Sequence, residues 1–133
     1  QGKPKFAELQ AAINLMTIVS DKVAFDHQIV DALVSAYMAS DFKPVLAQNI
    51  AKLLSPPLQA GALQHFVDRL FACAPKSRQG FDALEEFVKV AQFPQDLRCA
   101  IAHKVRLLEQ DIQSDDLRKR LRRLLSYLQS GGS

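Results

Sequence analysis

Cysteine and histidine are the side chains in this sequence that could bind a metal, and one pair of them has a suitable spacing. Cys99 and His103 are four residues apart within a helical pattern, so one helix would place both side chains on the same face. A structural zinc site usually requires four such ligands. The other candidates, Cys73, His27 and His65, belong to other helical segments than Cys99 and His103. His65 and Cys73 are eight residues apart, about two helical turns, which is too far for a chelating pair, so we expect no metal and no cofactor. A zinc site that includes Cys99 and His103 is the alternative.

Residues capable of acid–base or nucleophilic catalysis are present, but their spacing does not suit catalysis. Glu85 and Glu86 are adjacent, so a helix would point their carboxylates about 100° apart. Neither Cys73 nor Cys99 lies at an expected helix start, where the helix dipole would favour the reactive thiolate. The five glycines include no phosphate-binding loop. These patterns favour a protein that is not an enzyme, with both cysteines as buried, reduced thiols.

The strongest concentration of charge is a basic stretch near the end of the sequence, within "DDLRKRLRRLLSYLQ" (residues 115–129). On a helical wheel its leucines gather within about a quarter-turn, so they would dock on the preceding helices. The cations would face outward and are the predicted binding residues: Arg118, Lys119, Arg120, Arg122 and Arg123. A solvated capping helix without a partner is the alternative, because the terminal helix of a repeat array needs a polar outer face.

Charge is distributed unevenly along the chain, whose formal net charge is +3. Residues 1–94 contain nine Lys or Arg and nine Asp or Glu, whereas residues 95–133 contain eight and five, so the excess lies in the last two helices. A protein or peptide segment, preferably acidic, is the expected partner. Nucleic acid is the alternative, less favoured because the aromatic residues that could stack on bases occupy inward-facing stripes. A membrane partner is not expected, because the core needs the leucines.

Apolar residues recur with a helical period throughout, and no segment alternates for long enough to predict a strand. The sequence therefore predicts an all-α fold of about seven helices. Asp26 and Ser114 are well placed to cap the second and the seventh helix. The expected helices lie at about residues 6–19, 26–39 and 44–54, around residues 63–71, at about 81–91 and 94–112, and from residue 114 onward.

Length and composition indicate one soluble globular unit. Apolar residues make up 48% of the chain and charged residues 23%, and no apolar run approaches the roughly 20 residues of a membrane-spanning helix. We expect a single helical domain over residues 5–129, with flexible tails at residues 1–4 and 130–133. Free thiols and the absence of a visible signal peptide predict an intracellular protein, cytoplasmic or nuclear.

An internal repeat is visible at an offset of 37 residues, where "IVDALVSA" (residues 29–36) resembles "FVDRLFAC" (residues 66–73). Other apolar positions match at the same offset, and the last match requires one inserted residue. The pattern predicts three helical hairpins followed by a basic C-terminal capping helix, because each hairpin has an apolar face that only a neighbour can bury. A helical bundle without repeats is the alternative.

One hairpin resembles those of known repeat proteins. The segment "ALVSAYMASDFKPVLAQNIAKLL" (residues 32–54) has an apolar stripe with alanine and tyrosine, a short polar turn with an acidic residue, and a second helix ending in Leu-Leu. It is similar to the hairpins of tetratricopeptide and pentatricopeptide proteins. The resemblance implies an α-solenoid in the broad sense, and it carries no functional residue to this chain.

The expected function is that of a protein-interaction domain, a scaffold or adaptor without catalytic activity, within a larger intracellular protein. It would bind a partner segment in a groove between helices or on the basic C-terminal helix. The alternative is an RNA- or DNA-binding helical-repeat domain that uses the same basic helix. Salt distinguishes the two, because phosphate binding weakens steeply as salt rises and apolar binding does not.

Overall fold

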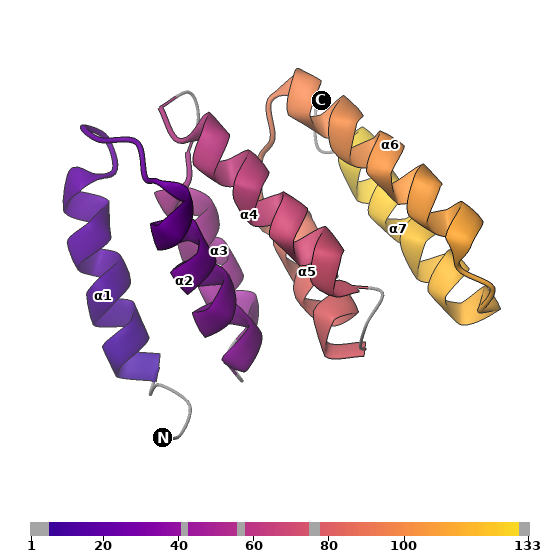
Figure 1. Ribbon diagram of the computed structural model, residues 1–133, viewed down its shortest axis with the longest axis horizontal. Helices are drawn as coiled ribbons and strands as arrows, with labels where there is room; N and C mark the ends of the chain where they lie inside the picture. The colour runs from indigo at the N-terminus through magenta and orange to yellow at the C-terminus, as the bar shows by residue number, and fades with distance from the viewer. Residues whose placement is uncertain (1–5, 41–42, 56–57, 75–77, 131–133) are drawn as a thin grey trace. The chain divides into compact units, whose positions relative to one another are not determined.

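The computed structural model describes residues 6–40, 43–55, 58–74 and 78–130, and these form seven α-helices without a strand (Figure 1). The all-helical class predicted from the sequence is therefore confirmed. Of the expected tails, residues 1–4 and 131–133 lie outside the described residues, and Ser130 ends the last helix. The helices are α1 (Phe6–Val19), α2 (His27–Ala39), α3 (Lys43–Leu53), α4 (Ala60–Cys73), α5 (Arg78–Val90), α6 (Gln95–Asp111) and α7 (Asp115–Ser130).

Contacts divide the chain into two compact units, residues 1–91 with α1 to α5 and residues 92–133 with α6 and α7. In the first unit α2 packs against α3 and α4, α5 packs against α3 and α4, and α1 packs against α3. In the second unit α6 packs against α7. The seventh helix therefore has a hairpin partner, whereas the sequence-based grouping leaves it as a lone cap. Only three residues separate α6 from α7, and so short a connection makes them antiparallel neighbours.

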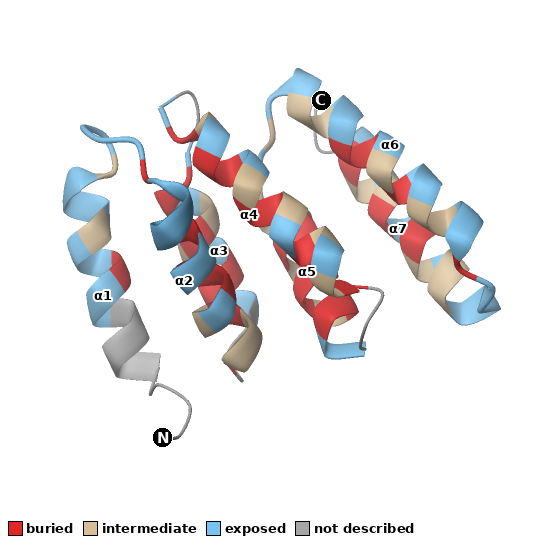
Figure 2. Ribbon diagram, in the orientation of Figure 1, coloured by how far each residue is buried: buried red, intermediate tan, exposed pale blue. Residues whose placement is uncertain are grey.

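The core of the first unit is built around three aromatic rings, one each from α2, α4 and α5. The buried positions of these helices are red in Figure 2. Tyr37, Phe66 and Phe87 are fully buried, with ring centroids 4.7 to 6.5 Å apart. These tilted and edge-on arrangements are the favourable ones for aromatic pairs. The Tyr37 hydroxyl donates to the Ala83 carbonyl at 2.7 Å. Burial, reinforced by the charge of Glu86, raises the pKa of Tyr37 above its usual value, so this hydroxyl keeps its proton.

In the second unit the leucine face of α7 docks on α6, as the sequence predicts. Leu117 and Leu125 are half-buried at the edge of this face. Each fully buried aliphatic side chain contributes about 1.5–3 kcal/mol relative to its exposed state, so the hairpin has an apolar core of its own. The buried residues of α6 and α7 include Ile101, Val105, Leu121, Leu124 and Leu128.

Side-chain caps begin two of the helices at the residues expected from the sequence. The Asp26 carboxylate accepts a hydrogen bond from the Ile29 N–H at 2.9 Å, in the first turn of α2. The Ser114 hydroxyl oxygen accepts from the Leu117 N–H at 3.5 Å, in the first turn of α7. Each cap satisfies a backbone donor that has no partner within its helix. These contacts confirm the two predicted starts.

A buried glutamine joins the connector between α1 and α2 to the start of α4. Gln59 is only 1% exposed. Its Oε1 accepts from the Phe25 N–H at 2.9 Å, and its Nε2 donates to the carbonyls of Ser20 and Val23 at 2.7 and 2.6 Å. One side chain therefore satisfies three backbone groups that lie 34 to 39 residues away in the sequence. Through the connector it also holds the end of α1.

Two glycines in helices should respond in opposite ways to replacement by alanine. A Cβ at Gly80 would lie 2.5 Å from the Cys73 carbonyl oxygen, so Gly80→Ala should lower the free energy of unfolding by about 1–3 kcal/mol. A Cβ at Gly61 would meet nothing within 4 Å, so Gly61→Ala should raise it by about 0.4–1 kcal/mol. Urea denaturation of both variants measures the two changes. A Gly80→Ala variant as stable as the wild type would contradict the close approach of α5 to the end of α4.

Candidate binding sites in the two units

The first of the predicted binding residues, Arg118, serves the fold of the hairpin. Its Nε–H donates to the Ile112 carbonyl at 2.8 Å, and its side chain is half-buried. Ile112 is the C-cap of α6, where carbonyl groups lack helical partners and attract a cation. Arg118 therefore stabilises the turn between α6 and α7, which reduces its capacity to bind a partner.

The other predicted cations lie along α7 and differ in their exposure and in their contacts with the rest of the fold. Arg122 has a side chain that is 70% exposed and an Nε atom 3.4 Å from the Glu109 Oε1 of α6. Lys119 and Arg123 are exposed, whereas Arg120 is half-buried. Arg120 and Arg123 also have interactions of their own within the fold. The basic stretch is thus partly engaged by its own hairpin, and exposed pairs such as Arg122 with Glu109 contribute little to stability.

The two cysteines differ from the expectation of buried thiols. Cys99 is exposed on α6, and Cys73 is half-buried on α4. The reason at Cys99 is helical geometry, because it precedes the buried Ile101 by two residues and therefore points about 200° away from it. His103 is exposed on the same helix. In the described part of the chain, no three His, Cys, Asp or Glu side chains are grouped so that they could hold a metal ion.

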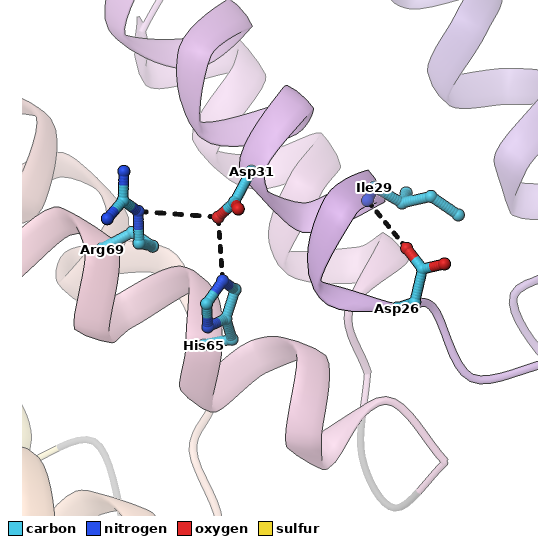
Figure 3. A network of polar contacts seen from close by, with 5 residues as sticks. All are labelled: Asp26, Ile29, Asp31, His65 and Arg69. Atoms are coloured by element: carbon cyan, nitrogen blue, oxygen red, sulfur yellow. Dashed lines mark hydrogen bonds and ion pairs between the residues drawn. The ribbon is translucent and has the colours of Figure 1, made fainter.

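Two histidines that the sequence places on separate helices come together between α2 and α4. The rings of His27 and His65 stack with centroids 3.9 Å apart and an interplanar angle of 1°. The Asp31 Oδ1 lies 2.8 Å from the His65 Nε2 and 3.5 Å from the Arg69 Nε (Figure 3). Because Asp31 is half exposed, these contacts hold α2 beside α4 without forming an enclosed site.

An apolar groove lies among α1, α2 and α3 in the first unit. Its volume is about 250 Å³. Small alanine side chains on α1 and α2 leave this space open, because α1 packs against α3 and scarcely against α2. Among the described lining residues the Tyr37 hydroxyl is the one polar side-chain group, and it is already bonded to Ala83. The lining residues are Ala12, Ile13, Met16, Ile29, Ala32, Leu33, Ala36, Tyr37, Leu46 and Ile50.

Exposed aliphatic side chains lie on the helices that form this groove. Leu15 and Ile18 on α1 are 68% and 64% exposed, and Ile29, which lines the groove, is itself exposed. Figure 2 shows the corresponding part of α1 largely in pale blue. Ile18 follows the lining Met16 by two residues and so points about 200° away from it, whereas Ile29 belongs to the groove itself. An apolar groove with an exposed aliphatic residue in its lining is typical of a surface that binds another protein. The sequence suggests a groove between helices in general terms, but it does not locate it.

Comparison of the chain with protein-family models, with curated proteins and with solved structures gives no match. Within the described residues, no helix has both the length and the apolar character needed to cross a membrane. We therefore infer function from the groove of the first unit and the charged surface of the second.

Proposed function

We propose that this chain is a non-enzymatic protein-interaction domain whose groove among α1, α2 and α3 binds the apolar face of a partner helix. The observation that carries the proposal is the apolar groove itself. About 250 Å³ exceeds the roughly 150 Å³ of an engineered cavity that binds benzene, so there is room for more than one aliphatic side chain. Burying such side chains removes apolar surface from water on both partners, which favours association.

A helix suits this groove better than an extended peptide does. The described lining residues offer no free hydrogen-bonding side chain, so they cannot satisfy the backbone N–H and C=O groups of an extended segment. A helix satisfies those groups itself and presents side chains at i, i+3, i+4 and i+7. The lining residues of α2 follow the same spacing from Ile29 to Ala36, over about two helical turns.

We also propose that the helices form a short α-solenoid. What supports this arrangement in the first unit is that α2 lies beside α4 and α3 beside α5, as consecutive hairpins of a solenoid do. A solenoid exposes grooves between neighbouring helices, and partner segments commonly bind there.

Binding of nucleic acid to α7 is the competing proposal. It is favoured by the exposed Lys119 and by the mostly exposed Arg122. Against it, Arg118 donates to a backbone carbonyl and Arg122 faces Glu109 of the same hairpin. A phosphate ligand would have to compete with those contacts, whereas none of the described residues would have to leave the groove of the first unit.

Introducing a carboxylate into the groove should weaken the binding of an apolar helix while the fold persists. Peptides selected from a displayed library of helix-forming sequences are the probe, and their affinity for the wild type and the Ala32→Glu variant is measured by calorimetry. Ala32 lines the groove but is itself exposed, so the variant should fold. A bound apolar helix would desolvate the new charge, and we expect at least a tenfold loss of affinity, about 1.4 kcal/mol.

Ser35→Glu provides the matched control, because Ser35 is exposed on the same helix and does not line the groove. This variant should bind the selected peptides as the wild type does, at low and at high salt. The selection could instead yield acidic peptides that bind Ala32→Glu as tightly as the wild type and are released by salt. That result would place the site on α7 and overturn the proposal.

A further inference from the structure

A second cavity, of about 270 Å³, lies in the second unit between α6 and the end of α7. Arg98, Ala102 and Arg106 follow one another at intervals of four residues, so they share one face of α6. The small Ala102 leaves space between the two arginines. None of the described lining residues is acidic, so among them the two arginine charges have no counterion. Its lining comprises Gln95, Arg98, Cys99, Ala102, Arg106, Leu128 and Gln129.

One donor in this cavity lacks an acceptor. The Arg98 Nε is buried, and no group of the described residues accepts its hydrogen bond. A guanidinium group does not lose its proton in proteins, so this N–H is a permanent donor. A buried donor without a partner is unfavourable, and most such groups in native proteins have one. The fold thus leaves a charged donor unpaired, and a ligand would supply its acceptor once the Arg98 side chain turns this N–H toward the cavity.

Helix ends do not reverse the charge of the cavity. Gln95 is the first residue of α6, where free backbone N–H groups attract anions, and Pro94 provides no side-chain cap. Leu128 and Gln129 belong to the last turns of α7, whose carbonyl groups have the opposite effect. These two contributions offset each other. The charge of the cavity is therefore set by Arg98 and Arg106.

We propose that this cavity binds a phosphate monoester. The phosphate group would pair with both guanidinium groups, which match its geometry, and the Arg98 side chain would turn its buried Nε–H toward the bound phosphate. A monoester phosphate has a charge of about −1.5 to −2 at pH 7 and so balances two arginines, whereas a carboxylate balances one. Arg98 and Arg106 are about 12 Å apart along the helix axis, a distance that two long side chains can close around one phosphate.

The organic part of the ligand would contact the apolar wall formed by Ala102 and Leu128. This contact distinguishes an ester from free phosphate, which would use only the arginines. The site lies in the second unit and the groove in the first, so this proposal and the proposed function can fail separately.

Three matched anions test the site in the full chain: phenyl phosphate, inorganic phosphate and benzoate. Each is titrated at constant ionic strength while the Arg98 Nε–Hε signal is followed by NMR. We expect a saturable shift with phenyl phosphate, with weaker binding of inorganic phosphate and at least tenfold weaker binding of benzoate. Equal affinity for benzoate would overturn the assignment to phosphate, and tighter binding of inorganic phosphate would overturn the assignment to an ester. An Arg98 signal that does not saturate with phenyl phosphate would overturn the site.

Substitutions and thiol labelling give independent readouts of the same site. Arg106 is exposed, and Arg106→Gln should lower the affinity of the protein for phenyl phosphate at least tenfold. Lys119 lies outside the cavity, so Lys119→Gln should leave the affinity for phenyl phosphate unchanged. Bound phenyl phosphate should also slow the alkylation of Cys99 by neutral iodoacetamide, with Cys73 of the first unit as the internal control. Equal effects of the two substitutions, or unaltered labelling of Cys99 at saturation, would contradict binding in this cavity.

Discussion

Replacing Gln59 by leucine should lower the free energy of unfolding by about 2–4 kcal/mol, because three backbone groups lose their partner at once. The substitution retains most of the side-chain volume, so the effect would report the lost hydrogen bonds and not a cavity. The hydrogen bond from the Phe25 N–H is buried, and those to the carbonyls of Ser20 and Val23 are part-buried. In the variant all three backbone groups lose the Gln59 side chain as partner. Urea denaturation followed by far-UV circular dichroism measures the change.

Gln64→Leu is the control for this substitution, because Gln64 is exposed on α4, the helix whose N-cap is Gln59. We expect it to change stability by less than about 0.5 kcal/mol. The Gln59→Leu variant should also bind groove peptides less well, since the connector that Gln59 holds leads from α1, one wall of the groove, to α2. Unchanged stability of Gln59→Leu would mean that the connector is held by other contacts.

Leu121→Ala should destabilise the second unit by about 2–5 kcal/mol, the usual cost of shortening a buried leucine. Leu121 is 0% exposed at the interface between α7 and α6. Hydrogen exchange at the amides of α6 and α7 measures the loss, because protection falls about tenfold for each 1.4 kcal/mol. Lys119→Gln, two residues earlier and exposed, should cost under about 0.5 kcal/mol. Protection that is unchanged in Leu121→Ala would show that α7 does not depend on its leucine face for docking.

Features that depend on residues close in sequence were predictable. Apolar periodicity locates the helices, because each must bury one face, and the caps at Asp26 and Ser114 depend on residues three positions apart. The leucine face of α7 follows from the same periodicity, and Leu121 and Leu124 are buried as expected. One start was wrong: α5 begins at Arg78 instead of Phe81. Gly80 permits this earlier start, because it has no Cβ to meet the end of α4.

Contacts between distant residues were not predictable in the same way. Gln59 resembles any polar residue near a turn, and only the fold shows that it bonds to a connector 34 residues earlier. The stack of His27 on His65 does not follow from the repeat, because the two histidines are 38 residues apart and the repeat offset is 37. The proposed phosphate cavity depends on an arginine nitrogen without a partner, which no sequence pattern reveals.

The most direct test of groove binding is to locate a selected helical peptide on the domain by NMR. The isoleucine, leucine and valine methyl groups are labelled, and their signals are followed during titration with the peptide. Binding in the groove predicts saturable shifts at Ile13, Ile29 and Leu33, while the signals of Leu121 and Leu124 stay in place. Shifts confined to the leucines of α7, with the groove methyl signals unchanged at saturation, would contradict the proposed function.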